Sequence, residues 1–161
     1  MHMKPFLTVV LVPLLALSGS KTAEERAALR QATEQHVAQA VANRHLLIDI
    51  RSMDSQRYGS RYNLTDFTLE LRGDTVVSNL PYLGRAYRAS YGTPPKVLNF
   101  TAPIEHFQQE RSKKNVVRIT FLTQTDEDRY HYTIEVFPQG RCYIVVRPQE
   151  RDLVSFDGEL R

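Results

Sequence analysis

The sequence predicts an α+β protein, in which an N-terminal helix is followed by a mostly antiparallel, barrel-like or sandwich β domain of about seven or eight strands. Two observations predict this fold class. Apolar residues recur at near-helical spacing over residues 22–44, whereas from residue 46 onward they alternate with polar residues. The alternating segments are joined by short turns, and hairpin links make neighbouring strands antiparallel.

Residues 1–18 have the layout of a secretory signal peptide. Lys4 gives a positive start, an almost unbroken apolar run covers residues 6–17, and small residues follow as far as Ser20. The apolar run is too short for a membrane-spanning helix. We therefore expect an exported protein that is periplasmic or associated with the outer envelope. The alternative is a hydrophobic helix that stays attached.

The end of this leader resembles a bacterial lipoprotein box. In the string Leu17-Ser18-Gly19-Ser20, serine stands where the lipid-bearing cysteine would be. Lipid attachment needs a thiol, so a lipid anchor is not possible at Ser20. Three interpretations stay open: a soluble exported protein cleaved near Ser18, a lipoprotein that has drifted, or an engineered Cys→Ser change.

Composition predicts one domain with a mixed-charge surface. The chain has 161 residues, and its 21 Lys and Arg against 18 Asp and Glu give a formal net charge of +3. This balance does not suit a nucleic-acid-binding protein, and no second apolar stretch could span a bilayer. Cys142 is the single cysteine and cannot form an internal disulfide, so we expect a small buried residue and stability from packing.

The segment 19–45 is expected to be helical. Thr22 and Glu25 form a capping box, and Asn43 is a suitable stop. Much of the apolar stripe between them is alanine, so its burial stabilises little. The helix is expected either to pack on a sheet face or to act as a spacer behind the export site.

The β domain covers residues 46–161. Its first half predicts strands at residues 46–53, 67–72 and 75–80, with a loop at 55–61. Gly73-Asp74 joins two of these strands, and a two-residue turn with glycine first suits a type II′ hairpin. Arg72-Gly73-Asp74 matches an integrin-binding tripeptide, but turn chemistry explains it fully.

The second half of this domain repeats the alternating pattern. The acidic turn 126–128 lacks the oxygen spacing of a calcium loop, so we expect it to be solvated. Gly158 permits a bulge in the last strand. The predicted strands are residues 117–121, 129–137, 141–147 and 153–160.

Between the two halves, residues 80–100 break the alternation and are dense in Tyr, Pro and Gly. Tyr82, Arg85, Tyr87 and Tyr91 are the candidate ligand or partner surface of the protein. The other interpretation is a covering flap whose tyrosines close one end of the core, with Arg85 binding backbone carbonyls. We favour the flap, because Pro, Gly and Tyr together suit a buried irregular crossover.

Four short strings carry a resemblance to a known family. They are Arg72-Gly73-Asp74-x-Val76, then Leu80-Pro81-Tyr82-Leu83-Gly84-Arg85-Ala86-Tyr87, then Tyr91-Gly92 with Asn99-Phe100, and finally Ser155-Phe156-Asp157-Gly158. On these residues the chain resembles the domain of unknown function 4251 family of exported proteins and lipoproteins of Gram-negative bacteria. Many relatives carry a lipobox cysteine where this chain has Ser20. The resemblance implies no activity and no catalytic residues.

No motif in the sequence indicates a particular reaction. The chain has no G-x-S-x-G string and no phosphate-binding glycine loop, and its five histidines lack the spacing of a zinc site. We therefore expect no metal and no cofactor. The predicted function is a non-catalytic binding or scaffold domain with an unknown envelope ligand or protein partner. The alternatives are a secreted hydrolase, whose acid–base pair is not visible in the sequence, and a purely structural envelope component.

Overall fold

The structure is a computed structural model that describes residues 22–84 and 97–161. Over these residues one helix, α1 (Ala23–Ala42), is followed by ten strands. The strands are β1 (His45–Ser55), β2 (Gly59–Arg61), β3 (Thr68–Arg72), β4 (Thr75–Pro81), β5 (Val97–Pro103), β6 (Glu105–Arg111), β7 (Val117–Gln124), β8 (Arg129–Val136), β9 (Arg141–Pro148) and β10 (Val154–Leu160).

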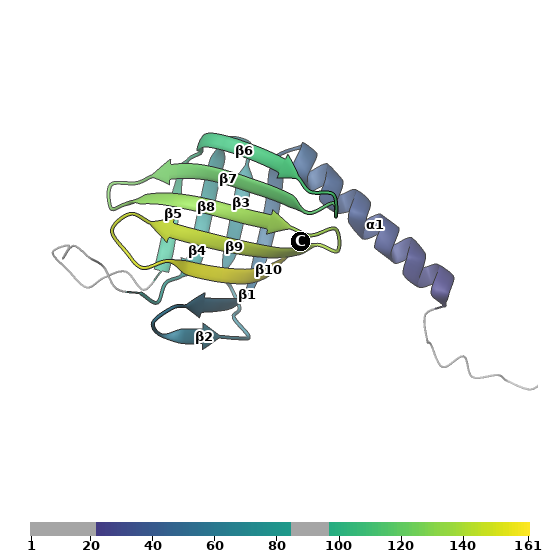
Figure 1. Ribbon diagram of the computed structural model, residues 1–161, viewed down its shortest axis with the longest axis horizontal. Helices are drawn as coiled ribbons and strands as arrows, with labels where there is room; N and C mark the ends of the chain where they lie inside the picture. The colour runs from purple at the N-terminus through teal and green to yellow at the C-terminus, as the bar shows by residue number, and fades with distance from the viewer. Residues whose placement is uncertain (1–21, 85–96) are drawn as a thin grey trace, which may run out of the picture.

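The strands form one antiparallel sheet that curls into a nearly closed barrel. Their order is β5-β4-β3-β1-β10-β9-β8-β7-β6, and β2 pairs with β1 off this path. The two end strands, β5 and β6, follow each other in the chain through Ile104, so the ends of the sheet meet at a corner. In Figure 1 the strands β1, β3, β4 and β5 cross behind β6–β10. The predicted fold class, a helix followed by an antiparallel barrel-like domain, is confirmed.

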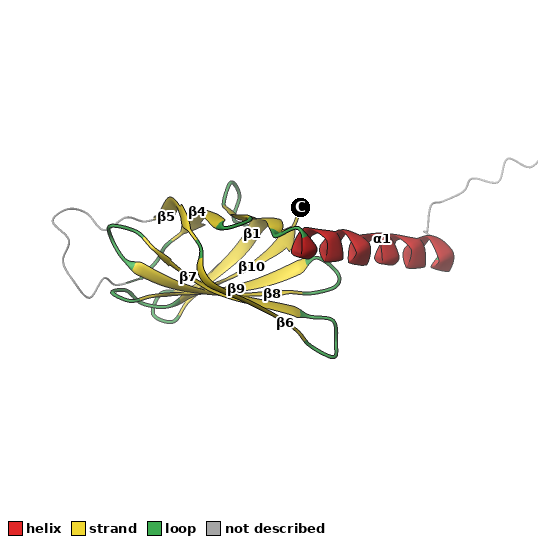
Figure 2. Ribbon diagram, turned by 90° about the horizontal axis from the view of Figure 1, so that it is seen from above, coloured by secondary structure: helices red, strands yellow, loops and turns green. Residues whose placement is uncertain are grey.

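The helix begins and ends where the sequence predicts. Thr22 and Glu25 form both bonds of a capping box: the Glu25 N–H donates to the Thr22 hydroxyl oxygen (3.2 Å), and the Thr22 N–H donates to the Glu25 carboxylate (3.0 Å). Asn43 is the C-cap, and the buried residues of the helix are Val37 and Val41. Figure 2 shows the N-terminal part of α1 pointing away from the barrel, whereas Val37 and Val41 in its C-terminal half join the buried core.

The alternating segments form strands with one buried face. Leu46, Ile48 and Ile50 of β1 point into the barrel, as do Leu69 and Leu71 of β3. Because side chains alternate along a strand, this pattern sets the register of the whole sheet. In this part of the chain no helix has the length and apolar character needed to cross a membrane.

The β3–β4 turn has the predicted geometry. A type II′ turn has a positive φ at its first central residue and a negative φ at its second. Gly73 has a φ of +58°, and Asp74 is not among the residues with a positive φ. The Gly73 N–H donates to the Arg44 carbonyl oxygen (2.8 Å), and Arg44 also donates to the Asp74 carboxylate (3.2 Å). Arg72 donates two bonds to Glu70 (2.6 and 2.7 Å). The Arg72 side chain is thus bound within its own hairpin, and the Asp74 side chain is bound to Arg44, just before β1.

The bulge lies in β1, opposite Gly158, and not in the last strand as expected. The register shifts in β1 between Ile50, which pairs with Gly158, and Ser52, which pairs with Asp157. A Cβ at position 158 would lie 2.5 Å from the Asp49 carbonyl oxygen. The strands therefore approach so closely here that only glycine fits.

Three strands were not predicted. The segment 55–61, expected to be a loop, contains β2, and β5 and β6 lie in segments for which no strand was predicted. The side chains of β2 are exposed throughout, and those of β6 are exposed except for a half-buried Phe107. A strand without one buried face lacks the alternation by which sequence analysis finds strands. The main path accordingly has nine strands and not seven or eight.

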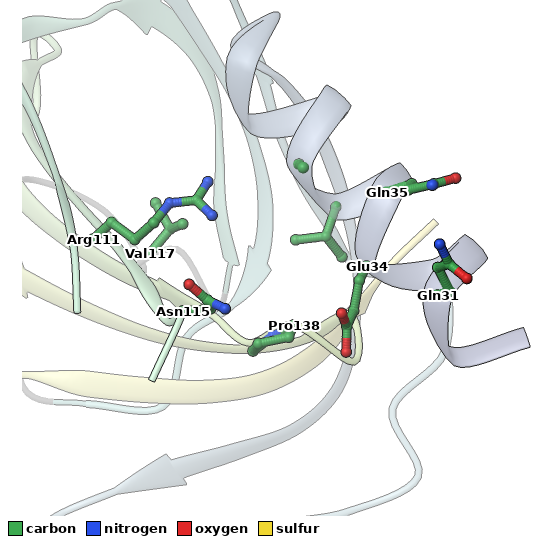
Figure 3. A pocket seen from close by; sticks show the side chains of 9 residues that line it. Gln31, Glu34, Gln35, Arg111, Asn115, Val117 and Pro138 are labelled. Carbon is green, nitrogen blue, oxygen red and sulfur yellow. The ribbon is translucent and has the colours of Figure 1, made fainter. Parts of the chain in front are cut away.

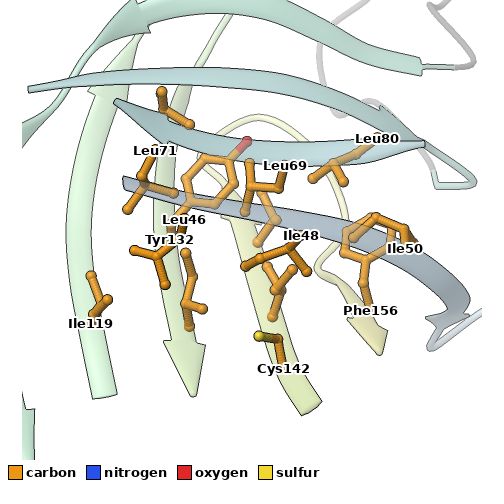
Figure 4. Packing of buried hydrophobic residues seen from close by; sticks show 14 of the residues in the cluster. Leu46, Ile48, Ile50, Leu69, Leu71, Leu80, Ile119, Tyr132, Cys142 and Phe156 are labelled. Carbon is orange, nitrogen blue, oxygen red and sulfur yellow. The ribbon is translucent and has the colours of Figure 1, made fainter. Parts of the chain in front are cut away.

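Side chains fill the inside of the barrel. Figure 4 shows Leu46, Ile48 and Leu69 from one layer packed against Ile119 and Phe156 from the other. Inside the barrel a buried polar chain of contacts runs from the Tyr132 hydroxyl to Ser78 Oγ (3.2 Å) and from Ser78 Oγ to the Leu98 carbonyl oxygen (2.9 Å). Cys142 is buried in this core as expected, and burial raises the pKa of its thiol to about 12.

Candidate functional site

Tyr82 is the member of the predicted surface that lies within the described residues; Arg85, Tyr87 and Tyr91 lie outside them. The Tyr82 side chain is 5% exposed and packs in the core. Its hydroxyl donates to the Asp152 carbonyl oxygen (3.1 Å), and the Arg151 guanidinium lies 5.7 Å from the centre of its ring. Tyr82 therefore joins the end of β4 to the β9–β10 turn, while the four-residue surface as a whole stays a prediction.

Gly84 is required by the position of the Tyr82 ring. The chain bends back after Tyr82, and a Cβ at position 84 would collide with the Cζ and hydroxyl oxygen of that ring. The ring is held by the core on one side and by its hydrogen bond on the other, so it has little room to move. Close approach of the backbone to the ring explains the glycine at position 84.

The acidic turn between β7 and β8 is not solvated at Asp128, contrary to expectation. Asp128 is buried, and its Oδ1 accepts N–H bonds from Arg129 (2.7 Å), Gln149 (3.1 Å) and Glu150 (3.2 Å). A buried carboxylate is costly unless hydrogen bonds and an opposite charge compensate it. Here the donors come from its own turn and from the β9–β10 turn.

Arg151 supplies the opposite charge. Its side chain is 7% exposed, its Nε lies 3.7 Å from Asp128 Oδ2, and an NH2 group donates to Glu127 Oε2 at 2.9 Å. We call Tyr82, Glu127, Asp128 and Arg151 the Arg151 clasp. The clasp holds the end of β4, the β7–β8 turn and the β9–β10 turn together at one side of the barrel.

A cleft of about 320 Å³ lies beside the clasp, between β5 and the β7–β8 turn. Phe100 and Tyr130 stack in it with ring centres 4.9 Å apart. Its lining includes the carboxylates of Asp126 and Glu127 and no basic side chain. We call this the β5 cleft, and its lining residues are Leu98, Asn99, Phe100, Thr125, Asp126, Glu127 and Tyr130.

A second cleft of about 300 Å³ separates α1 from the barrel (Figure 3). Gln31, Glu34 and Gln35 of the helix line it together with Arg111 and Asn115 near the β6–β7 turn, and the Gln35 side chain points away from those two residues. All five side chains are exposed. Ligand sites usually combine an apolar or aromatic wall with a few fixed polar groups, and the β5 cleft fits that description better. The β5 cleft is therefore the candidate site.

His45, Glu70 and Arg72 form a titratable cluster at the surface of the sheet. His45 Nε2 lies 3.3 Å from Glu70 Oε1, and the bonds from Arg72 to the same carboxylate lower the pKa of Glu70. Exposed ion pairs of this kind contribute little to stability. Among residues 22–84 and 97–161, no group of three or more His, Cys, Asp and Glu side chains is placed to hold a metal ion.

Sequence reasoning missed the clasp and most of the cleft. Arg151 and Asp128 lie in separate turns between predicted strands. The local spacing of residues does not indicate that β8 and β9 bring these two turns together. Asn99 and Phe100 were noticed only as part of a family string. A buried charge in a polar turn has no sequence signature of its own, because its partner is distant in the chain.

The fold and cleft define a small α+β barrel domain with a filled interior and a helix projecting from it. The family described as domain of unknown function (DUF4251) matches residues 28–160, and the chain belongs to this family. The chain is also similar to the crystal structure, at 1.95 Å resolution, of a DUF4251 family protein from Bacteroides eggerthii DSM 20697. That likeness has a TM-score of 0.60 at 9% identity and covers 80% of this chain and 87% of the other. At this identity it concerns the fold alone. A comparison with curated proteins found no match.

Proposed function

We propose that the protein is an exported component of the bacterial envelope whose barrel is a non-catalytic binding or scaffold domain. The observation that carries this proposal is the filled interior. Side chains such as Ile48, Ile119 and Tyr132 are completely buried inside the barrel, so they occupy the space in which other barrels hold a ligand. A partner would then be bound at the outside, where the β5 cleft is the best-formed hollow.

The helix supports the envelope part of the proposal. It has 20 residues, which corresponds to a length of about 30 Å. Of its residues only Val37 and Val41 are buried, so the first half of the helix stands clear of the barrel. A polar rod between a leader-like segment and a folded domain is suited to hold that domain away from a membrane surface.

The hydrolase alternative gains no support from the described residues. Catalysis of that kind uses a neutral acid with a raised pKa next to a base. Among the described side chains that are neutral acids, those with a raised pKa are Tyr130, Tyr132 and Cys142, and in each case burial in the core is the main cause. These groups belong to the packing of the barrel.

Export is the first point to test. The full chain with a C-terminal tag would be produced in a Gram-negative host, fractionated, and its intact mass measured. We expect the barrel in the periplasmic or envelope fraction, shortened by roughly the length of a signal peptide. A full-length product among cytosolic markers would overturn the proposal.

A further inference from the structure

Among the described strands, none pairs with the outer edge of β5. Over the described residues β5 pairs with β4, and it is the end of the sheet. The Ile104 N–H donates to the Asp74 carbonyl oxygen (2.8 Å). This bond shows which residues of β5 direct their backbone N–H and C=O groups toward β4. Because bonding alternates along an antiparallel pair, the N–H and C=O groups of Asn99 and Thr101 then point away from β4.

A second contact agrees with this pattern. Pro103 follows the same alternation, and its carbonyl oxygen accepts a bond from the Thr123 hydroxyl of β7 at 2.8 Å. The contact closes the barrel at the β5–β6 corner. Farther along β5, toward Asn99, the edge faces the β5 cleft instead of another strand.

The side chains of β5 do not protect its edge. Natural proteins commonly guard free edges with charged residues. The strand at the other end of the sheet, β6, carries Glu105, Glu110 and Arg111, whereas β5 (VLNFTAP) has no charged residue. The charged side chains that would discourage pairing are therefore found on β6 and not on β5.

The opposite wall of the cleft is acidic. Asp126 and Glu127 line it from the β7–β8 turn, and the clasp holds that turn in place through Asp128 and Arg151. Glu127 shares its charge with Arg151, but its side chain is 59% exposed and one oxygen is not used in that bond. A cleft with two carboxylates and no basic lining attracts a cationic group.

We propose that the β5 cleft binds an extended segment of a partner protein. The segment adds to β5 as a strand, pairing with the backbone of Asn99 and Thr101, and places a lysine or arginine side chain against Asp126 and Glu127. The volume of about 320 Å³ is at the small end of the range for ligand pockets, which favours a short segment over a second copy of the barrel. This inference rests on the proposed binding function.

The test uses the purified mature protein and a displayed library of random seven-residue peptides. We expect selected peptides to carry a lysine or arginine at a fixed position and to lose affinity as salt is raised. The best peptide would then be synthesised with blocked ends and titrated against variants. Selection of peptides without a basic residue, or of none above background, would overturn the inference.

Two variants at one position separate backbone pairing from side-chain contact. Thr101→Pro removes an outward N–H but leaves the bonds to β4, because those come from Phe100 and Ala102. Thr101→Ala keeps the N–H. We expect Thr101→Pro to weaken peptide binding by about tenfold or more and Thr101→Ala to leave it within about twofold. Equal affinity for both variants would contradict strand addition.

Amide exchange of the wild-type protein gives a measurement that needs no variant to fold. Bound peptide should slow exchange of the Asn99 and Thr101 amides by about tenfold or more, and unchanged rates would contradict the inference. If the protein is exported but selects no basic peptide, strand addition is overturned, and the proposed function stands as a scaffold domain. A cytosolic barrel would overturn the proposed function itself.

Discussion

Arg151 and Asp128 form a buried ion pair that joins two turns of the barrel. The Nε of Arg151 lies 3.7 Å from Oδ2 of Asp128, and their side chains are only 7% and 1% exposed. One residue belongs to the β9–β10 turn and the other to the β7–β8 turn. Since Tyr82 lies against the same guanidinium, the pair also reaches the end of β4. The packing of this side of the barrel depends on both charges being present.

Removal of Arg151 should destabilise the protein strongly. Arg151→Met keeps most of the side-chain volume but leaves Asp128 as a buried charge without a counter-ion, which costs about 3–5 kcal/mol when a buried pair is broken. Urea unfolding followed by circular dichroism would measure the loss. Arg147→Met on the exposed face of β9 is the matched control and should change stability by less than about 0.5 kcal/mol. A similar effect of both changes would show that the pair is not what stabilises the turns.

Gly84→Ala should also destabilise the protein, through a collision with the Tyr82 ring. Overpacking of this kind typically costs about 1–3 kcal/mol. The partner residue provides the control, because Tyr82→Leu removes the Cζ and hydroxyl that the new methyl group would meet. In a double-mutant cycle, Gly84→Ala should cost clearly less when leucine is at position 82. Equal costs in the two backgrounds would mean that the ring is not the obstacle.

The extent to which the fold follows from sequence depends on burial. The strands β1 and β3 each have one buried face, and the alternation of Leu46, Ile48, Leu69 and Leu71 with polar neighbours makes them predictable. The strand β6 is exposed on both faces and has no such pattern. Its position is decided by pairing with β7 across the turn at residues 112–116, a relation that an apolar–polar alternation does not reveal.

The candidate site is less predictable than the fold. Tyr82 was predicted to be part of a ligand or partner surface. In the structure it is a buried core residue whose hydroxyl donates to the Asp152 carbonyl oxygen. Asp128 was expected in solvent, because an acidic turn is usually solvated. Its burial is possible only because the β9–β10 turn offers the backbone N–H groups of Gln149 and Glu150. Compensation of this kind is a property of the assembled barrel.

Tyr132→Phe should test the buried polar contact in the core. The change removes the hydroxyl that donates to Ser78 Oγ, while Ser78 keeps its own bond to the Leu98 carbonyl oxygen. Because Ser78 Oγ still has a hydrogen-bond partner in this variant, we expect the unfolding free energy to fall by only about 0.5–1.5 kcal/mol. Ser78→Ala removes both bonds and leaves the buried Tyr132 hydroxyl without a partner, so it should lower the unfolding free energy by more than Tyr132→Phe does. The reverse order would contradict this arrangement.

Ser20→Cys should restore a lipid anchor if the leader ends in a lipoprotein box. The change supplies the thiol that lipid attachment needs, and we expect the protein to move into a lipid-labelled, detergent-extracted membrane fraction in a Gram-negative host. Labelling with a radioactive or clickable fatty acid is the measurement. Ser18→Cys is the matched control, because its thiol lies at a different distance from the apolar run. A Ser20→Cys protein without label would show that the box is not recognised.

Cys142 should make stability depend on pH in alkaline solution. Burial is the main cause that raises the pKa of its thiol from 9.0 to about 12. Below about pH 8.5 the thiol is mostly protonated in both the folded and the unfolded chain, so it has little effect on the pH dependence. Above that pH the unfolded chain releases its proton while the folded chain keeps it, so the free energy of unfolding falls as pH rises.

Cys142→Ala isolates this contribution, because the titrating tyrosines Tyr130 and Tyr132 are present in both proteins. The stability of the wild type relative to the variant should be constant below about pH 8.5 and should then fall by up to about 1.4 kcal/mol per pH unit. Urea unfolding under reducing conditions at pH 8, 9.5 and 10.5, values chosen to bracket the thiol's ordinary pKa of 9.0, would measure it. A difference that stays constant over this range would mean that the thiol ionises in the folded chain, and that the core around Cys142 admits water.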